Sequence, residues 1–253
     1  MTTAARIENK HRTLEGVKAV IEAVLIAIVI RTFLFQPFNN PSGSMEPTLR
    51  IGDYLFVSKY SYGYSQYSFP VSLPLFKGRI LAAEPQRGDI VVFRHGSVDF
   101  IKRLIGLPGD RIQMIGGALY LNGQQVERQR VADFVGRDPC GPSEPNASRV
   151  RVPQWRETLP SGVSYDTLAC GAFAAFPDFT PVYAVPPGHF FMLGDNRENS
   201  EDSRFPDVGY VPFDDLIGRA QVIFFSIAPR QSPWELWNWP WSIRWRRLFT
   251  VVH

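Results

Sequence analysis

The sequence predicts a mainly β protein that is anchored by one N-terminal transmembrane helix. A long apolar run, residues 16–35, has the length of a helix that spans a bilayer. Beyond residue 40 the apolar runs are short, rich in β-branched and aromatic residues, and separated by Gly, Pro, Asn and Asp. With 45% hydrophobic and 13% aromatic residues, the 253-residue chain can bury one substantial core.

The expected anchor, residues 16–35, reads GVKAVIEAVLIAIVIRTFLF. A helix of this length reaches about 30 Å, the thickness of a bilayer core. Lys18 and Arg31 lie near its ends, where long side chains reach the interface, whereas Glu22 is costly inside a membrane. The alternative is a cleaved secretory signal, but bulky residues follow the apolar run where a small-x-small site would be needed.

Basic residues before the expected anchor indicate its orientation. The tail of residues 1–15 holds three Lys or Arg residues, whereas after Arg31 the next basic residue is Arg50. The positive-inside rule therefore predicts a cytoplasmic N-terminal tail, with the body of the protein across the membrane.

The β-rich core is predicted from strand-like runs on both sides of a long insertion. These runs are residues 54–60, 89–94, 100–107, 190–193 and 220–227. Gly116-Gly117 and Asn122-Gly123 predict two tight hairpin turns. From about residue 127 to 187 prolines accumulate and the strand pattern weakens. We therefore expect a core of residues 36–112 and 188–230 that is interrupted by an irregular, β-containing inserted subdomain, residues 113–187.

The last segment, residues 231–253, differs from the rest of the chain because it carries five of the six tryptophans together with several arginines. Indole rings prefer the headgroup zone of a bilayer and cations meet anionic lipid, so this composition predicts a membrane-interface tail. Packing of these tryptophans on the protein's own surface, or on a partner, stays open.

Composition also excludes several classes of function. A net charge of +3 without a basic stripe argues against nucleic-acid binding. The two cysteines, Cys140 and Cys170, have no CxxC or histidine spacing, so we expect no metal site and no cofactor. Whether they form a disulfide or stay as free thiols is left open by the sequence.

Two blocks contain residues suited to nucleophilic chemistry. PSGSMEPTLRIGDYLFV places Ser42 and Ser44 on a loop that leads into a strand, where a glycine lets the backbone approach a substrate. In DFIKRLIGLPGDRI, strand alternation puts Lys102 between Phe100 and Leu104 on one face. Apolar surroundings lower the pKa of a lysine by several units, which would let its amine accept a proton from a serine. An edge-strand lysine that faces water is the alternative.

A third block, GDNRENSEDSR, is a polar run that suggests a loop held by ion pairs, or simply a solvated loop. The histidines offer no better base for a serine. His11 precedes the expected anchor, His253 is the last residue, and His95 and His189 read as turn or strand-entry residues.

In this order, the anchor and the blocks PSGSMEPTL, RGDIVVF, IKRLIGLPGD and GDNRENSEDSR resemble the bacterial type I signal peptidase family, which uses a Ser/Lys dyad. The resemblance implies that Ser44 is the nucleophile and Lys102 the general base. It also implies an oxyanion hole formed by the hydroxyl of Ser42 and the N–H of Ser44. The remaining roles concern support and substrate. The resemblance gives Ser200, Asp202, Arg204 and Arg103 to the orientation and support of the lysine, and Phe38, Met45, Leu49 and Ile101 to substrate binding.

The same resemblance implies an activity and a location. The enzyme would remove signal peptides from exported preproteins after small-x-small sites, in the bacterial inner (cytoplasmic) membrane, with the catalytic domain on the periplasmic side. Its partners would be preproteins and the phospholipid bilayer. Two alternatives remain: a dedicated Ser/Lys peptidase for a pilin or conjugation factor, and a catalytically silent, membrane-tethered β domain that binds exported proteins.

Overall fold

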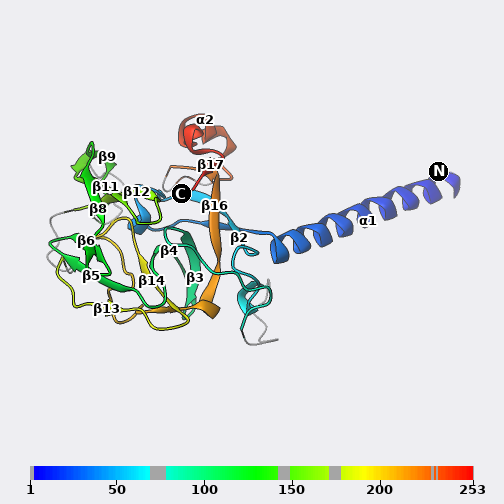
Figure 1. Ribbon diagram of the computed structural model, residues 1–253. Helices are drawn as coiled ribbons and strands as arrows, with labels where there is room; N and C mark the ends of the chain where they lie inside the picture. Colours follow the sequence, from blue (N-terminus) through cyan, green and yellow to red (C-terminus); the bar gives the residue numbers. More distant parts are fainter. Residues whose placement is uncertain are drawn as a thin grey trace.

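The computed structural model describes residues 3–68, 78–141, 149–170, 178–228, 231 and 233–252, with side chains from residue 15 onward. It consists of a β-rich body and one long helix, α1 (Thr3–Phe33), which projects away from that body (Figure 1). The mainly β fold that the sequence predicts is therefore confirmed.

The largest sheet in the described residues has eight strands and runs in the order β1-β2-β16-β3-β4-β14-β15, with β17 paired to β16. Its strands are β1 (Phe35–Asn39), β2 (Asp53–Ser58), β3 (Ile90–His95), β4 (Val98–Gly106), β14 (His189–Leu193), β15 (Val211–Pro212), β16 (Leu216–Ser226) and β17 (Thr250–Val251). The five strands expected from the short apolar runs all lie in this sheet. Strand β16 comes from the far end of the chain and lies between β2 and β3, so the sheet joins both sides of the insertion (Figure 1).

Three smaller sheets occupy the described part of the insertion. They contain β13-β5-β6-β7, β12-β11-β8 and β10-β9. Their strands are β5 (Arg111–Ile115), β6 (Ala118–Leu121), β7 (Gln124–Gln125), β8 (Glu127–Arg130), β9 (Phe134–Arg137), β10 (Arg149–Val152), β11 (Gln154–Thr158), β12 (Ser164–Leu168) and β13 (Tyr183–Ala184). The insertion is thus more regular than its proline content indicates, and the expected boundary at residue 112 lies inside β5.

The two predicted hairpin turns are confirmed. Gly116-Gly117 joins β5 to β6, and Asn122-Gly123 joins β6 to β7. All four of these residues have positive φ, the backbone conformation that a two-residue type I′ turn requires and that glycine and asparagine tolerate best.

The main core lies where β2, β3 and β16 face the segment that follows Ser44. Its members are apolar and largely excluded from solvent: Met45, Leu49, Leu55, Val57, Ile90, Val92, Ile101, Ile217, Ala220, Ile223 and Val252. Burial of these apolar side chains is the main source of stability for the sheet, at about 1.5–3 kcal/mol for each large side chain. It also fixes Met45, the residue that follows Ser44.

Helix α1 contains the segment expected to be a transmembrane anchor. Within the described residues, no helix combines the length and the apolar character needed to cross a bilayer. The structure therefore does not show the predicted span over residues 16–35. Lys18, Glu22 and Arg31 interrupt its apolar sequence, and Lys18 and Glu22 form an exposed ion pair at 3.8 Å.

The C-terminal segment folds back onto the body. It contains a short helix, α2 (Trp239–Ser242), and the strand β17, which pairs with β16. Arg247 forms a salt bridge at 2.5 Å with the carboxylate of Asp53, which is fully buried. This segment is therefore part of the folded body, although Trp237 and Trp241 remain 71% and 84% exposed.

Candidate active site

Ser44 lies in a single turn of 3-10 helix, Gly43–Met45, directly after strand β1 and its following loop. Ser42 caps this turn, because its Oγ accepts a hydrogen bond of 3.2 Å from the N–H of Ser44. Asn196 holds the same turn from the other side. Its N–H donates to the carbonyl of Ser44 at 3.0 Å, and its Nδ2 donates to the carbonyl of Gly43 at 3.2 Å. The Ser44 hydroxyl is thus carried on a backbone with fixed partners.

Lys102 projects from β4 toward that turn. The strand lies between β3 and β14, so Lys102 is on an interior strand of the sheet and not on an edge. Its Nζ lies 2.6 Å from the Oγ of Ser44, and the two residues are only 4% and 5% exposed. The structure therefore brings together the serine and the lysine that the sequence singled out.

The surroundings of Lys102 suit a lysine that loses its proton easily. Burial lowers the pKa of the amine from its ordinary value of 10.5 to about 8, although the negative charges of Asp202 and Glu201 act in the opposite direction. The ring of Phe100 lies 5.6 Å from Nζ on the same face of the strand. A substantial fraction of the amine is consequently neutral near pH 8.

Ser200 and Asp202 lie behind Lys102. Ser200 is buried, lines the same cavity as Lys102, and donates its hydroxyl to Oδ2 of Asp202 at 2.8 Å. Arg204 pairs with Asp202 through Nε at 2.8 Å. Burial alone would raise the pKa of Asp202, but the Arg204 cation, together with the hydrogen bonds to the carboxylate, outweighs this effect and the pKa lies below its usual range. The bonded partner of the Ser200 hydroxyl is thus Asp202, a neighbour of the lysine.

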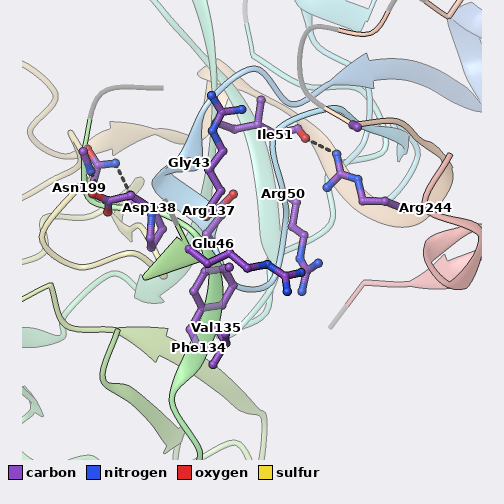
Figure 2. A pocket seen from close by; sticks show the side chains of 15 residues that line it. Gly43, Glu46, Arg50, Ile51, Phe134, Val135, Arg137, Asp138, Asn199 and Arg244 are labelled. Atoms are coloured by element: carbon purple, nitrogen blue, oxygen red, sulfur yellow. Dashed lines mark hydrogen bonds between the residues drawn. The ribbon is translucent and has the colours of Figure 1, made fainter. Parts of the chain in front are cut away.

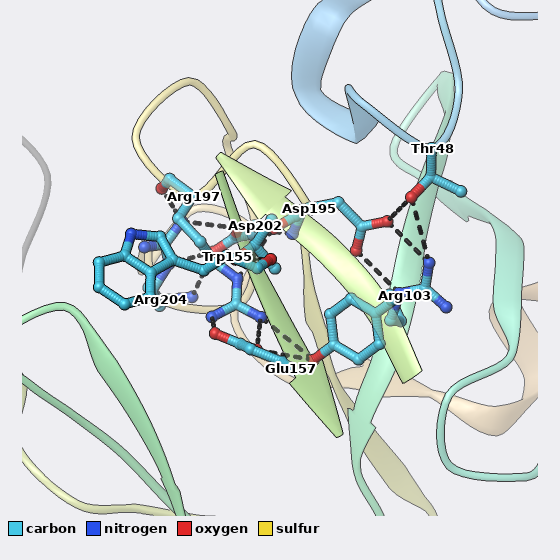
Figure 3. A network of polar contacts seen from close by, with 11 residues as sticks. Thr48, Arg103, Trp155, Glu157, Asp195, Arg197, Asp202 and Arg204 are labelled. Carbon is cyan, nitrogen blue, oxygen red and sulfur yellow. Dashed lines mark hydrogen bonds and ion pairs between the residues drawn. The ribbon is translucent and has the colours of Figure 1, made fainter. Parts of the chain in front are cut away.

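Arg103 faces away from Lys102, as strand alternation predicts, and belongs to a second polar network (Figure 3). It donates from two nitrogens to Asp195, at 2.8 and 2.7 Å, and Thr48 donates to the same carboxylate at 2.6 Å. The guanidinium also lies 4.1 Å from the ring centre of Tyr165, whose hydroxyl bonds to Glu157. This network joins β4 to the segment after Ser44 and to the inserted strands.

Gly194 is required because the turn that carries Ser44 and the polar block GDNRENSEDSR pack closely against each other. A Cβ at Gly194 would lie 2.1 Å from the Oγ of Ser200 and 2.6 Å from the carbonyl oxygen of Ser44. No side chain fits at that distance. The polar run therefore begins with glycine so that Ser200 can approach the turn that carries Ser44.

A cavity of about 560 Å³ opens onto Ser44 and Lys102. Phe38 and Ile101, two of the four expected substrate-binding residues, line this cavity together with Phe100. Met45 and Leu49 do not line it, because both are fully buried in the main core beneath it. Of the four residues, Phe38 and Ile101 therefore bound the space available to a ligand, whereas Met45 and Leu49 belong to the core.

Sequence reasoning missed two residues of this site. Asp195 and Asn196 both lie in the polar block GDNRENSEDSR, and both are almost fully buried. The signal that could have found them is their position directly after the buried strand β14, because polar residues that follow such a strand are placed close to whatever the sheet positions.

The two cysteines form a disulfide near the active-site turn. Cys140 and Cys170 are bonded to each other, with their Cα atoms 5.8 Å apart. The bond lies close to the turn, since the carbonyl of Pro139 accepts from Nδ2 of both Asn196 and Asn199, each at 2.7 Å.

A serine hydroxyl in contact with a buried amine at the edge of an open cavity is the arrangement of a serine hydrolase that uses an amine as its base. The sequence matches the family model described as signal peptidase, peptidase S26, over residues 13–225. The chain therefore belongs to the S26 signal peptidase family, and it is a serine endopeptidase.

Similar curated proteins carry the name signal peptidase I. One from Rickettsia typhi is 45% identical over 213 residues, which covers 80% of this chain and 76% of that protein. One from Rickettsia conorii is 42% identical over 249 residues, which covers 91% and 90%. A crystal structure of a signal peptidase I from Enterococcus faecalis V583 is 27% identical and covers 54% of this chain and 97% of its own, with a TM-score of 0.31.

Proposed function

We propose that this enzyme removes signal peptides from exported preproteins, with Ser44 as the nucleophile and Lys102 as the general base. The observation that carries these two roles is the distance of 2.6 Å between the Lys102 amine and the Ser44 hydroxyl in a buried setting. The names of the related proteins support the substrate class.

The reaction begins when the neutral amine of Lys102 takes the proton from Ser44 as its Oγ attacks the carbonyl carbon of the scissile bond. The Ser44 N–H and the Ser42 hydroxyl stabilise the oxyanion that forms. In the free enzyme these two groups bond to each other, so the substrate oxygen takes the N–H over from the Ser42 oxygen. The Ser42 hydroxyl then turns to donate its own proton.

The second half of the reaction returns the lysine to its neutral form. The Lys102 ammonium donates its proton to the leaving amine, and the ester between Ser44 and the signal peptide remains. Lys102 next takes a proton from the water molecule whose oxygen attacks the ester carbonyl. The bond between that carbon and the Ser44 oxygen then breaks, the Lys102 ammonium returns the proton to Ser44 Oγ, and the signal peptide leaves with a free carboxylate. Asp202 keeps its negative charge throughout, since Arg204 stabilises the carboxylate.

The substrate lies extended in the 560 Å³ cavity, between the end of β1 and the start of β4. Phe38, Phe100 and Ile101 give this cavity an apolar lining that suits small apolar side chains before the cleaved bond. Met45 and Leu49 are fully packed in the main core and add no space to this cavity, which favours small side chains in a small-x-small site.

Membrane attachment is part of the proposal, with residues 16–35 in the inner membrane, the N-terminus in the cytoplasm and the catalytic body on the periplasmic side. Helix α1 supports this because its apolar side chains are exposed along its length, among them Ile21, Leu25 and Val29. Between Glu22 and Arg31 the helix is apolar on every side, and it projects from the body, so a bilayer would supply the apolar surrounding that this stretch favours (Figure 1). Nothing in the relatives' names favours the alternative substrate, a pilin or a conjugation factor.

The proposal is tested by cleavage of a preprotein with the purified enzyme in detergent, using Ser44→Ala and Lys102→Ala. Each variant should lose at least about 10³-fold in kcat, because each removes an obligatory member of the dyad. Ser164→Ala and Lys59→Met serve as matched controls, since Ser164 lies on the exposed side of β12 and Lys59 is a second buried lysine that donates to the carbonyl of Ser68. Full cleavage by Ser44→Ala or by Lys102→Ala would refute the dyad.

A further inference from the structure

A second cavity, of about 410 Å³, lies on the other side of the turn that carries Ser44. Gly43 and Asn199 line it, and Asn199 also lines the first cavity. The two cavities therefore adjoin at Asn199, and the second one reaches Gly43, the residue before Ser44. Figure 2 shows Glu46, Arg50 and Arg137 around this second cavity.

The second cavity is basic, in contrast to the apolar first one. Its charged lining consists of four arginines, Arg50, Arg137, Arg149 and Arg244, and two acidic residues, Glu46 and Asp138. We call the site formed by these four arginines the arginine pocket. The carboxylate of Asp138 already accepts the backbone N–H groups of Cys140 and Gly141, so part of its hydrogen-bonding capacity is used within its own loop.

Two of these arginines face each other across a strand pair. Arg137 at the end of β9 is the Cα partner of Arg149 at the start of β10. Like charges directly opposite each other on two strands are destabilising. An anion bound beside this pair would lower the repulsion between the two guanidinium groups.

Arg50 and Arg244 extend the positive charge toward the C-terminal segment. Burial and the neighbouring cation of Arg247 lower the pKa of Arg50, although Glu46 and Asp53 act in the opposite direction. The pKa of Arg244 is lowered by burial, and its nearest acidic partner, Asp53 at 3.8 Å, offsets only part of the effect of burial and of Arg247 and Arg50. Among the described residues, Nε of Arg244 is buried and has no hydrogen-bond partner. The geometry and the charge both favour a negatively charged occupant.

We propose that the arginine pocket binds the carboxylate of an acidic residue in the first three positions after the cleaved bond. This inference rests on the proposed function. The apolar first cavity suits the residues before the bond, so the chain after the bond leaves Ser44 toward the second cavity. An extended chain advances about 3.3 Å per residue, and the arginine pocket begins at Gly43, directly beside Ser44. The enzyme thereby favours preproteins whose mature part carries Asp or Glu within its first three residues.

A phosphate group of a lipid or of free phosphate has related chemistry, but the position of the pocket favours the peptide. The pocket adjoins the nucleophile through Gly43 and Asn199, so the departing chain is brought to it by the reaction itself. Two arginines on a hairpin also suit the fork of a carboxylate.

The test compares two soluble peptides that share a small-x-small site and differ only after it, one with Glu and one with Gln at the second position. For the wild-type enzyme we expect kcat/KM to be about fivefold higher for the Glu peptide, the size expected of a partly exposed charge pair. The ratio should fall toward one in Arg137→Gln/Arg149→Gln, and it should also fall at high salt. Arg151→Gln is the matched control, because Arg151 is exposed on β10 and is not part of the arginine pocket.

Each outcome supports or overturns the inference. A wild-type enzyme that cleaves both peptides at equal rates overturns the pocket but leaves the proposed function intact. An enzyme that cleaves neither peptide nor any preprotein refutes the proposed function itself. An unchanged Glu preference in Arg137→Gln/Arg149→Gln overturns the proposal that the arginine pocket binds the peptide carboxylate. If that variant also loses binding to phosphatidylglycerol vesicles but not to phosphatidylcholine vesicles relative to wild type, the pocket is assigned to a lipid headgroup instead.

Discussion

Burial of the Lys102 amine is what makes it a usable base near neutral pH. At a pKa of about 8, roughly a tenth of the amine is neutral one pH unit below that value, whereas at an ordinary pKa of 10.5 the neutral fraction would be several hundred times smaller at neutral pH. The sheet supplies this burial, because Lys102 lies on an interior strand and packs beneath Phe100.

The pH dependence of peptide cleavage follows from this pKa. Since the neutral amine is the active form, kcat/KM should rise about tenfold per pH unit below pH 8 and level off above it. Lys59→Met should keep the same midpoint, although burial also lowers the pKa of Lys59 to about 8, because that amine bonds to Ser68 and not to Ser44. A profile that is flat, or that rises toward acid pH, would contradict the assignment of Lys102 as the base.

Single site residues could be predicted from the sequence where a residue type is unusual for the strand or loop that carries it. Lysine is disfavoured between two apolar residues on one face of a strand, so Lys102 between Phe100 and Leu104 suggested a functional role. The structure places its amine against the Ser44 hydroxyl. Asp195 and Asn196 could not be chosen from the polar block, because composition alone does not tell which side chains turn inward. The approach of Ser200 to the turn that carries Ser44 was equally impossible to predict, since it depends on the close packing that Gly194 permits.

Single strands and turns were predicted well because their signals are local. The alternation in β4 and the two glycine turns after β5 and β6 each depend on a few neighbouring residues. The strands of the insertion after residue 127 were not predicted individually, because prolines interrupt their short runs. Their pairing, for example β8 with β11, depends on contacts between residues far apart in the chain.

The disulfide acts at the scale of these elements, because it ties the loop after β9 to the end of β12. It bridges residues 30 positions apart, and closing a loop of that length in the unfolded chain is worth about 3–4 kcal/mol. We expect the free energy of unfolding of Cys140→Ser/Cys170→Ser, measured in urea, to be lower by about 3–4 kcal/mol. Its m value should be somewhat higher, because the unfolded chain without the cross-link exposes more surface. Reduction of the wild-type protein should lower its stability by a similar amount, and reduction of the variant should not. Equal stability of the oxidised and reduced wild type would refute a structural role for the bond.

For the whole molecule, strand order was the feature that the sequence could not supply. Strand β16 pairs with β2 across more than 150 residues, and no local pattern records such a partner. The C-terminal segment likewise looked like a separate tail, whereas Arg247 pairs with the buried Asp53 and β17 extends the sheet. Removing residues 232–253 would therefore leave a buried carboxylate without that partner and destabilise the body as a whole.

A sharper test of membrane contact leaves the contacts of Arg247 and β17 with the body intact and changes only the exposed tryptophan rings. Trp237 and Trp241 are mostly exposed, and indole groups at a bilayer interface each add binding free energy. In Trp237→Ala/Trp241→Ala we expect cleavage of a membrane-inserted preprotein in vesicles to fall about tenfold, while cleavage of a soluble peptide changes less than twofold. Trp155→Ala is a control for the loss of an indole, because its ring packs against Arg128 in the insertion and lies outside this segment. Equal losses with both substrates would show that the two rings stabilise the fold and do not contact the membrane.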